Sequence, residues 1–256
     1  MSSEGQPTSG CTKGIETGAG VEEVKPRLAL SEQEFGITNR ELMELRERAP
    51  LVHAFELAVL GEQWRRSKIE PGLAHGSYAA ECGVFQGHSM AACLAIADRS
   101  GLELTMVGLD SFDGLPPLSA TDLELAPATA PYRTQIFFGN TSRDLADRNI
   151  GAKAGRCRYE LVQGLFSQTL PKLAERTYFF VNIDCDLYEP HLECLEYFYP
   201  RVRQGGVIFF DDYHSLDYPM GRKAIDHFFA DKPEQLWHVR FGADGANLTK
   251  TYIVKL

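Results

Sequence analysis

The sequence predicts an α/β protein built on a doubly wound, mostly parallel sheet, with accessory helices before the sheet and an antiparallel hairpin at its C-terminal end. From Pro71 onward, apolar runs alternate with helix-like stretches, a rhythm typical of such sheets. The runs lack a clean polar alternation, as expected of strands that are covered on both faces. With 256 residues, 44% of them hydrophobic, the chain can bury the core of one such domain.

The N-terminal region divides into two parts. Residues 1–27 are rich in Ser, Gly, Thr and Glu and have almost no large apolar side chains, so we expect a disordered tail. Residues 28–70 carry apolar side chains at roughly helical spacing, and Pro50 interrupts the pattern. Because proline breaks the hydrogen bonding inside a helix, this region predicts two accessory helices.

Residues 71–256 are expected to form the main domain. The predicted parallel strands are 77–85, 104–112, 158–166, 178–187 and 205–213. The predicted helices are 88–100, 142–150, 190–202 and 220–231. Two closing runs, 237–242 and 251–256, flank a turn and could add antiparallel edge strands. The proline-rich segment at about 117–140 has no sustained helical period and is interpreted as a lid or acceptor loop.

Charge and cysteine content exclude several classes of protein. A net charge of −9 disfavours broad affinity for nucleic acid or for anionic membranes. The six cysteines form no C-x-x-C pair and no Cys/His zinc spacing, which fits a reduced, cytoplasmic protein. The N-terminus lacks the apolar segment of a signal peptide, and no run is long enough to span a bilayer, so we expect neither secretion nor membrane insertion.

A glycine-containing turn follows the first predicted strand and leads into a helix. Its letters, E-C-G-V-F-Q-G-H-S, place Glu81 ahead of Gly83 and Gly87, and Ser89 opens the helix. Glycines here let the backbone approach a ligand, and the helix start offers free N–H groups. A plain strand-to-helix turn would explain the glycine pair equally well. The spacing differs from the dinucleotide fingerprint G-x-G-x-x-G, which argues against NAD and for a ligand without a pyrophosphate.

Acidic residues follow three of the predicted strands. Asp110 ends the second strand, 23 positions after Gly87, where a carboxylate can accept hydrogen bonds from a ribose diol; a loop or capping aspartate is the alternative. Asp184 and Asp186 end the fourth run, and the pair 211–212 ends the fifth. Carboxylates that meet at one sheet edge repel one another unless a cation neutralises them, and oxygen ligands suit Mg²⁺, Mn²⁺ or Ca²⁺. Aspartates that cap the following helices remain the alternative.

These motifs occur in a specific order: E-x-G-x-x-x-G, G-L-D-S-F-D-G-L-P, G-L-F-S-Q-T-L-P, I-D-C-D-L-Y-E-P and G-G-V-I-F-F-D-D-Y. The set resembles class I S-adenosylmethionine-dependent methyltransferases, and more narrowly the macrocin/mycinamicin family of metal-dependent O-methyltransferases that act on sugars of macrolide antibiotics. The resemblance covers roughly residues 40–230, and its most specific segments are 110–116 and 184–188. It implies a Rossmann-like sheet and a homo-oligomer that uses the N-terminal helices.

The resemblance also implies roles for individual residues. The residues implied to bind the methionine part of the cofactor are Glu81, Gly83, Val84, Gly87 and Ser89. Asp110 and Ser111 would contact the ribose. The adenine would be bordered by Gly164, Leu165 and Phe166. A divalent metal, Mg²⁺ or Mn²⁺, would be held by Asp184, Asp211 and Asp212.

The implied reaction is S-adenosylmethionine- and Mg²⁺-dependent methylation of a hydroxylated small molecule, at a vicinal diol on a sugar of a secondary metabolite. Chelation to a cation lowers the pKa of a hydroxyl, and a nearby carboxylate can then take its proton. Catechol enzymes carry a base lysine three positions after the first metal aspartate; here that position is Leu187, so Asp186 is the predicted base. Alternative bases, each also explained by a solvated or capping role, are His75, His88, His191 and His214.

Other functions remain open from sequence alone. The acceptor could be a catechol or another polyol rather than a sugar. A nucleotide-binding oxidoreductase is disfavoured by the glycine spacing, and a noncatalytic binding domain is disfavoured by the presence of both sets of carboxylates. No nucleic-acid or membrane partner is expected.

Overall fold

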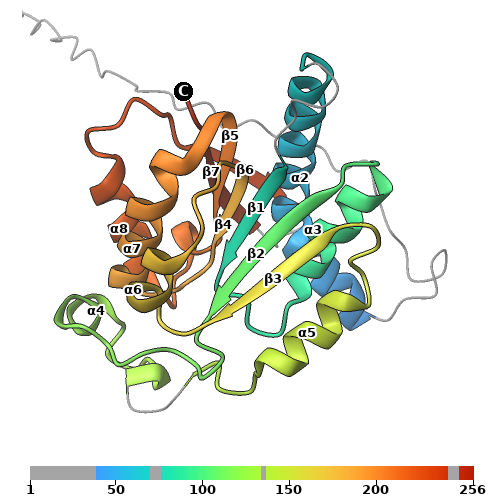
Figure 1. Ribbon diagram of the computed structural model, residues 1–256. Coiled ribbons are helices and arrows are strands. Elements are labelled where there is room, and N and C mark those ends of the chain that lie inside the picture. The colour runs from blue at the N-terminus through green and yellow to red at the C-terminus, as the bar shows by residue number, and fades with distance from the viewer. Residues whose placement is uncertain (1–38, 70–75, 134–136, 242–247) are drawn as a thin grey trace, which may run out of the picture.

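A single mixed sheet organises the computed structural model, which describes residues 39–69, 76–133, 137–241 and 248–256 (Figure 1). The strands of the described chain are β1 Ser77–Cys82, β2 Leu104–Asp110, β3 Arg158–Gln163, β4 Tyr178–Ile183, β5 Val202–Phe210, β6 Trp237–Phe241 and β7 Leu248–Val254. Their order is β3-β2-β1-β4-β5-β7-β6. The first five strands pair in parallel, and β7 pairs antiparallel with β5 and β6. The predicted parallel sheet and its C-terminal hairpin are confirmed.

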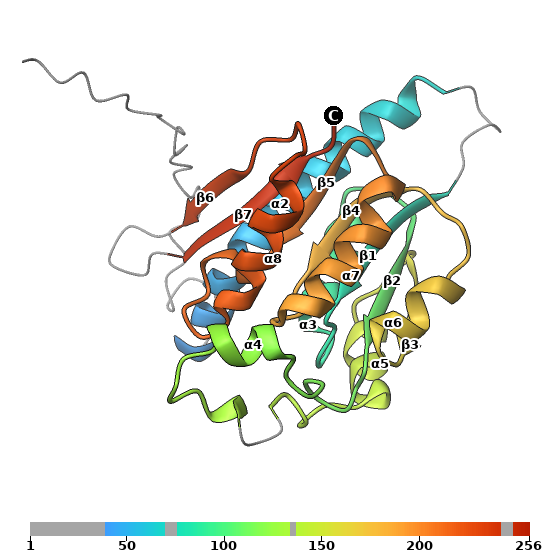
Figure 2. The ribbon, with the colours of Figure 1, turned by 90° about the vertical axis from the view of Figure 1, so that its left-hand side faces the viewer.

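Helices cover both faces of the sheet, as a doubly wound fold requires (Figures 1 and 2). One face carries α2 Asn39–Ser67, α3 His88–Arg99 and α5 Arg143–Gly151, and the other carries α6 Phe166–Thr169, α7 Tyr188–Phe198 and α8 Pro219–Phe229. Each face has its own hydrophobic cluster, built around Phe55 and Phe180 on one side and Phe198 and Phe210 on the other. The central strands β1, β2 and β4 and the second half of β5 are therefore buried on both faces, which explains their unbroken apolar runs. The edge strand β3 differs, because its residues are exposed or only half-buried, so the expectation of cover on both faces is wrong for this strand.

The predicted break at Pro50 is wrong. One helix, α2, runs from Asn39 to Ser67 with Pro50 inside it. Proline removes one backbone hydrogen bond, but α2 buries Leu51 and Phe55 against the sheet, and this packing offsets the loss. The predicted tail and the first part of the accessory region lie outside the described residues. The predicted homo-oligomer stays a prediction, although α2 leaves Leu60 and Trp64 exposed.

The segment interpreted as a lid contains regular structure. A short helix, α4 Ala120–Leu125, starts with a capping box in which Ser119 and Asp122 satisfy each other's backbone N–H groups. Asp122 also accepts a hydrogen bond from the Tyr188 N–H (2.8 Å), which fastens α4 to the start of α7. Leu187, buried beneath this contact, belongs to a small core shared with the lid segment. The segment is therefore a packed element and not irregular throughout.

The parallel strands end before the apolar runs do, and the site residues lie in the loops that follow. β1 ends at Cys82, where the predicted run continues to residue 85, and β4 ends at Ile183, so that Asp184 begins a loop. The Asp184 N–H donates to the Cys82 carbonyl (2.9 Å), which ties these two loops together. Within the described residues, no helix has both the length and the hydrophobicity needed to cross a membrane.

Gly83 permits this close approach of β1 and β4. Its φ is +92°, and a Cβ added there would lie 1.6 Å from the Asp184 carbonyl oxygen. Gly101 offers a matched comparison, because its φ is +72° but no atom lies within 4 Å of the Cβ position. Both glycines are in the left-handed region, so only the clash distinguishes them.

We expect Gly83→Ala to lower the free energy of unfolding far more than Gly101→Ala does. The left-handed conformation costs an alanine about 1–2 kcal/mol at either position. Only Gly83→Ala also forces the loop at Asp184 to move. Urea denaturation of both variants measures the difference, and equal losses would contradict the role given to this contact.

Candidate functional site

A cavity of about 330 Å³ opens at the carboxyl ends of the parallel strands. This is the edge at which open α/β sheets bind their ligands. The predicted site residues that line it are Gly83, Asp110, Ser111, Gly164, Leu165, Phe166, Asp184 and Asp186. The rest of its wall comes from the lid segment, including Pro117 and Phe138, and from the start of α7, including Glu189 and Glu193.

The other predicted cofactor residues do not line this cavity. Val84 is buried, Gly87 caps the N-terminus of α3, and Ser89 lies half-buried in the first turn of that helix. A Cβ at Gly87 would lie 2.8 Å from the Ile150 side chain, so this glycine serves the packing of α3 against α5. Val84, Gly87 and Ser89 therefore help to form the turn between β1 and α3 and do not contribute to the cavity wall.

Glu81 is fully buried between β1 and β4. It pairs in register with Asn182, whose Nδ2 donates to Glu81 Oε1 (2.8 Å). The two remaining side-chain oxygens, Glu81 Oε2 and Asn182 Oδ1, have no hydrogen-bond partner among the residues that the structure describes. Burial is the main cause that raises the pKa of Glu81, to about 8, and the nearby Asp110 and Asp211 add to it. When Glu81 is protonated, its carboxyl O–H can donate a hydrogen bond to an acceptor such as Asn182 Oδ1. The ionised form has no proton to donate and would leave that acceptor unpaired.

Asp110 accepts hydrogen bonds from the backbone of the loops that follow β1 and β2. The Phe85 N–H donates to its Oδ2 (2.7 Å), and the Phe112 N–H donates to its Oδ1 (2.7 Å). Both phenylalanines have a positive φ, 48° and 53°, which is uncommon for residues other than glycine. The carboxylate therefore stabilises two strained turns at the cavity mouth, and each oxygen keeps a second lone pair for a ligand hydroxyl.

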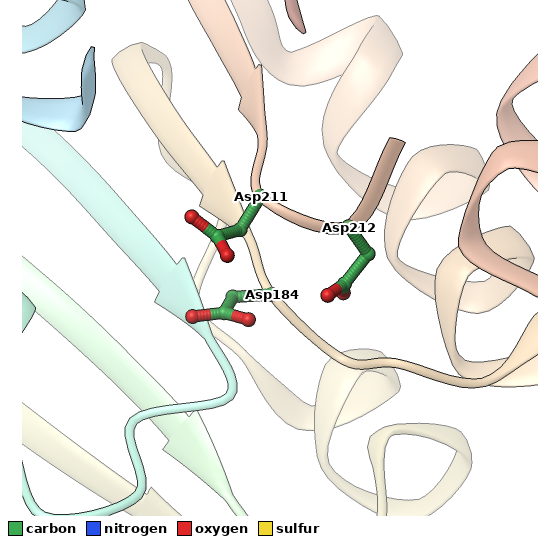
Figure 3. Close-up of side chains that lie close together, drawn as sticks. All are labelled: Asp184, Asp211 and Asp212. Carbon is green, nitrogen blue, oxygen red and sulfur yellow. The ribbon is translucent and has the colours of Figure 1, made fainter. Parts of the chain in front are cut away.

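Three carboxylates converge just beyond β4 and β5 (Figure 3). Asp184, Asp211 and Asp212 each place one oxygen within 4.8 Å of the others. Burial, followed by the neighbouring charges of Asp211 and Asp212, raises the pKa of Asp184 well above its usual value. The pKa of Asp212 rises to about 7, mainly through burial and then through Asp211. Three oxygen ligands that are costly to ionise together fit a divalent cation, which would relieve their repulsion.

Asp186 lies beside this triad in a strained backbone conformation. Its φ is +60°, and its N–H donates to Asp212 Oδ2 (2.9 Å). Burial and the charges of Asp212 and Asp211 raise the pKa of Asp186 well above its usual value. With this backbone conformation, Asp186 lines the cavity next to Asp184, so the loop after β4 contributes two carboxylates to it.

His191 underlies the triad and is not exposed to the cavity. Its Nδ1 lies 2.8 Å from the Leu187 carbonyl, which can only accept, so Nδ1 carries the proton. Nε2 faces Asp212 Oδ2 at 3.5 Å. Burial lowers the pKa of His191 to about 4, so the imidazole is neutral near pH 7. Of the other histidines considered as bases, His214 contacts Thr251 and His238, and His75 lies outside the described residues.

Two features of the site were missed by sequence reasoning. Lys250, from β7, donates to Asp211 Oδ2 (2.5 Å) and to the Asp211 carbonyl (2.9 Å). An aromatic wall formed by Phe85, Phe138, Tyr218 and Tyr132 links the glycine turn to the lid segment. Neither feature has a sequence motif, because each depends on segments that only the tertiary fold brings together.

Comparison with known proteins gives a family match and several structural likenesses. The family described as macrocin O-methyltransferase (TylF) matches residues 74–235. No curated protein sequence matches the chain. The structure of the O-methyltransferase NovP shares 22% identity, covers 82% of this chain and 80% of its own, and has a TM-score of 0.63.

Two structures of CalS11 are also similar. A structure described as a calicheamicin methyltransferase shares 19% identity, covers 89% of this chain and 87% of its own, and has a TM-score of 0.58. The apo structure, described as a TDP-rhamnose 3′-O-methyltransferase, shares 19% identity over 85% and 80% of the two chains, with a TM-score of 0.51. At these identities the likenesses show the fold alone.

The buried Glu81 predicts a specific pH dependence of stability. Its folded pKa, about 8, lies above its usual value of 4.5. The protonated acid therefore contributes stability that is complete below about pH 4.5 and is lost as the pH rises through 8. Relative to Glu81→Gln, the wild-type free energy of unfolding should fall by at most about 1.4 kcal/mol per pH unit between pH 5 and 8.

Urea denaturation at several pH values measures this difference. The control is Glu103→Gln, which changes an exposed glutamate and should follow the wild-type curve. If the free energy of unfolding changed with pH equally in wild type and Glu81→Gln, Glu81 would be ionised in the folded protein over this pH range. That result would refute a protonated Glu81 beside Asn182.

Proposed function

Because the chain belongs to the macrocin O-methyltransferase (TylF) family and is an O-methyltransferase, we propose that it transfers a methyl group from S-adenosylmethionine to a hydroxyl of a sugar on a secondary metabolite, with the help of a divalent cation. The observation that carries this proposal is the convergence of Asp184, Asp211 and Asp212 beside the ligand cavity. The similarity to CalS11, which is described as a calicheamicin methyltransferase and a TDP-rhamnose 3′-O-methyltransferase, supports the sugar acceptor.

The cavity has the features that S-adenosylmethionine needs. Gly83 contributes backbone to the cavity wall, Asp110 offers free lone pairs for ribose hydroxyls, and Gly164 to Phe166 form a wall for a flat base. The sulfonium carries a methyl group that is already activated, so the protein's task is to align the acceptor oxygen and raise its nucleophilicity. The carboxylates lining the cavity also favour a cationic ligand.

The carboxylate triad would hold Mg²⁺ or Mn²⁺ through one oxygen from each aspartate. A cation bound there supplies Lewis acidity that lowers the pKa of an acceptor hydroxyl, and two adjacent hydroxyls would allow chelation. Asp186, next to the triad, would receive the proton. Its raised pKa fits this role, since a carboxylate of pKa nearer neutrality is a better base than an ordinary one. The aromatic wall would exclude water from the acceptor side.

Methyl transfer to a diol-bearing glycoside should stop in excess EDTA and return with Mg²⁺. Cation affinity should also fall as the pH drops from 8 to 6, because protons compete for Asp212, whose pKa is about 7, and for Asp184. A screen of acceptors with radiolabelled methyl donor measures the first effect, and calorimetric titration of Mn²⁺ at both pH values measures the second. Activity indifferent to chelator, or tight NADH binding without binding of S-adenosylhomocysteine, would contradict the proposal.

At saturating Mn²⁺, Asp186→Asn should lower kcat by about 10²-fold or more, since the amide cannot accept a proton, while the affinity for S-adenosylhomocysteine stays within about threefold of wild type. The Asp186 N–H bond to Asp212 comes from the backbone and survives the substitution. Asp144→Asn makes the same chemical change at an exposed position on α5 and should keep wild-type turnover. Near-wild-type turnover in Asp186→Asn would remove this residue as the base.

A further inference from the structure

Lys250 places a permanent positive charge against the carboxylate triad. Its Nζ lies 2.5 Å from Asp211 Oδ2 and 2.9 Å from the Asp211 carbonyl oxygen. The side chain is only 17% exposed, so water screens the pair weakly. In the part of the chain that the structure describes, this is the only ammonium or guanidinium group within ion-pair distance of the three carboxylates.

The sheet itself holds Lys250 in this position. β7 pairs antiparallel with β5, and the pair Phe210 and Thr251 is the last in the ladder. Continuing that register by one residue on each strand sets Lys250 opposite Asp211. A shift of one residue would turn the lysine to the other face of the sheet. At the other end of the ladder, backbone hydrogen bonds from Gly205 to Lys255 and from Lys255 to Gly206 fix the register.

The charge has two physical consequences for the triad. When the site is empty, the ammonium neutralises one of three carboxylates that would otherwise repel one another near the core. A divalent cation held by Asp211 together with Asp184 and Asp212 would be repelled by this ammonium, because both are positively charged and both would contact Asp211. The first effect stabilises the empty site, and the second weakens binding of the cation.

We propose that Lys250 is a fixed counter-charge that keeps the cation site assembled when it is empty and keeps cation binding weak enough for exchange. Lys250 is thus a positioning residue for Asp211. This inference rests on the divalent cation of the proposed function. It goes further by assigning a role to a lysine of the C-terminal hairpin, outside the motifs that carry the aspartates.

Lys250→Met tests both effects without reliance on activity. Titration of Mn²⁺, followed by the electron paramagnetic resonance of the free ion, should show about tenfold tighter binding than in wild type, because the repelling charge is gone. In EDTA, the melting temperature of Lys250→Met should lie several degrees below that of wild type. Saturating Mg²⁺ should remove at least about half of this deficit, since tighter binding stabilises the folded state more.

Two control variants separate these effects from a general loss of packing. Lys250→Arg keeps the charge and should keep wild-type Mn²⁺ affinity. Lys255→Met removes a lysine of the same C-terminal segment that pairs with Glu234, and its loss of melting temperature should be the same in EDTA and in Mg²⁺.

The outcomes distinguish this inference from the proposed function. If wild type and Lys250→Met both fail to bind Mn²⁺, the divalent cation itself is wrong and the inference falls with it. If wild type binds Mn²⁺ and Lys250→Met binds it equally or more weakly, the cation stands and the counter-charge role is refuted. A melting deficit of equal size in EDTA and in Mg²⁺ would also refute it.

Discussion

The concentration of negative charge at the ends of β4 and β5 is the constraint on which the rest of the structure depends. Asp184, Asp211 and Asp212 come within 4.8 Å of one another, and Asp186 adds a fourth carboxylate beside them. Carboxylates this close repel one another when they are ionised together, and a nearby cation relieves that repulsion. The surrounding fold supplies partial compensation through Lys250 and through the Asp186 N–H, and the proposed divalent cation would supply the rest.

Backbone strain concentrates around the same cavity. The residues other than glycine with positive φ in the described chain are Phe85, Phe112, Phe138 and Asp186, and three of these line the cavity. Such conformations cost free energy, and they persist where surrounding contacts hold them. Asp110 supplies that restraint for Phe85 and Phe112 through its two oxygens. The backbone strain therefore lies around the cavity that is proposed to bind the cofactor.

The periodicity of apolar residues was sufficient to predict the sheet and its main helices, because strands buried on both faces and amphipathic helices leave clear local patterns. Prediction from periodicity failed where tertiary contacts override the local preference of the chain. Pro50 does not end α2, because the helix is held by its packing on the sheet. The triad was predictable, since the ends of neighbouring parallel strands must meet. The burial of Glu81 beside Asn182 and the contact of Lys250 with Asp211 could not be predicted, because both depend on strand register.

A crystal structure of the protein with S-adenosylhomocysteine and Mn²⁺ would test the central claim most directly. Anomalous scattering locates the metal without assumptions about its ligands. The account predicts one strong peak within coordination distance of an oxygen of each of Asp184, Asp211 and Asp212, beside a cofactor in the cavity next to Asp110. A Mn²⁺ ion bound elsewhere, or an empty triad at saturating Mn²⁺, would contradict it.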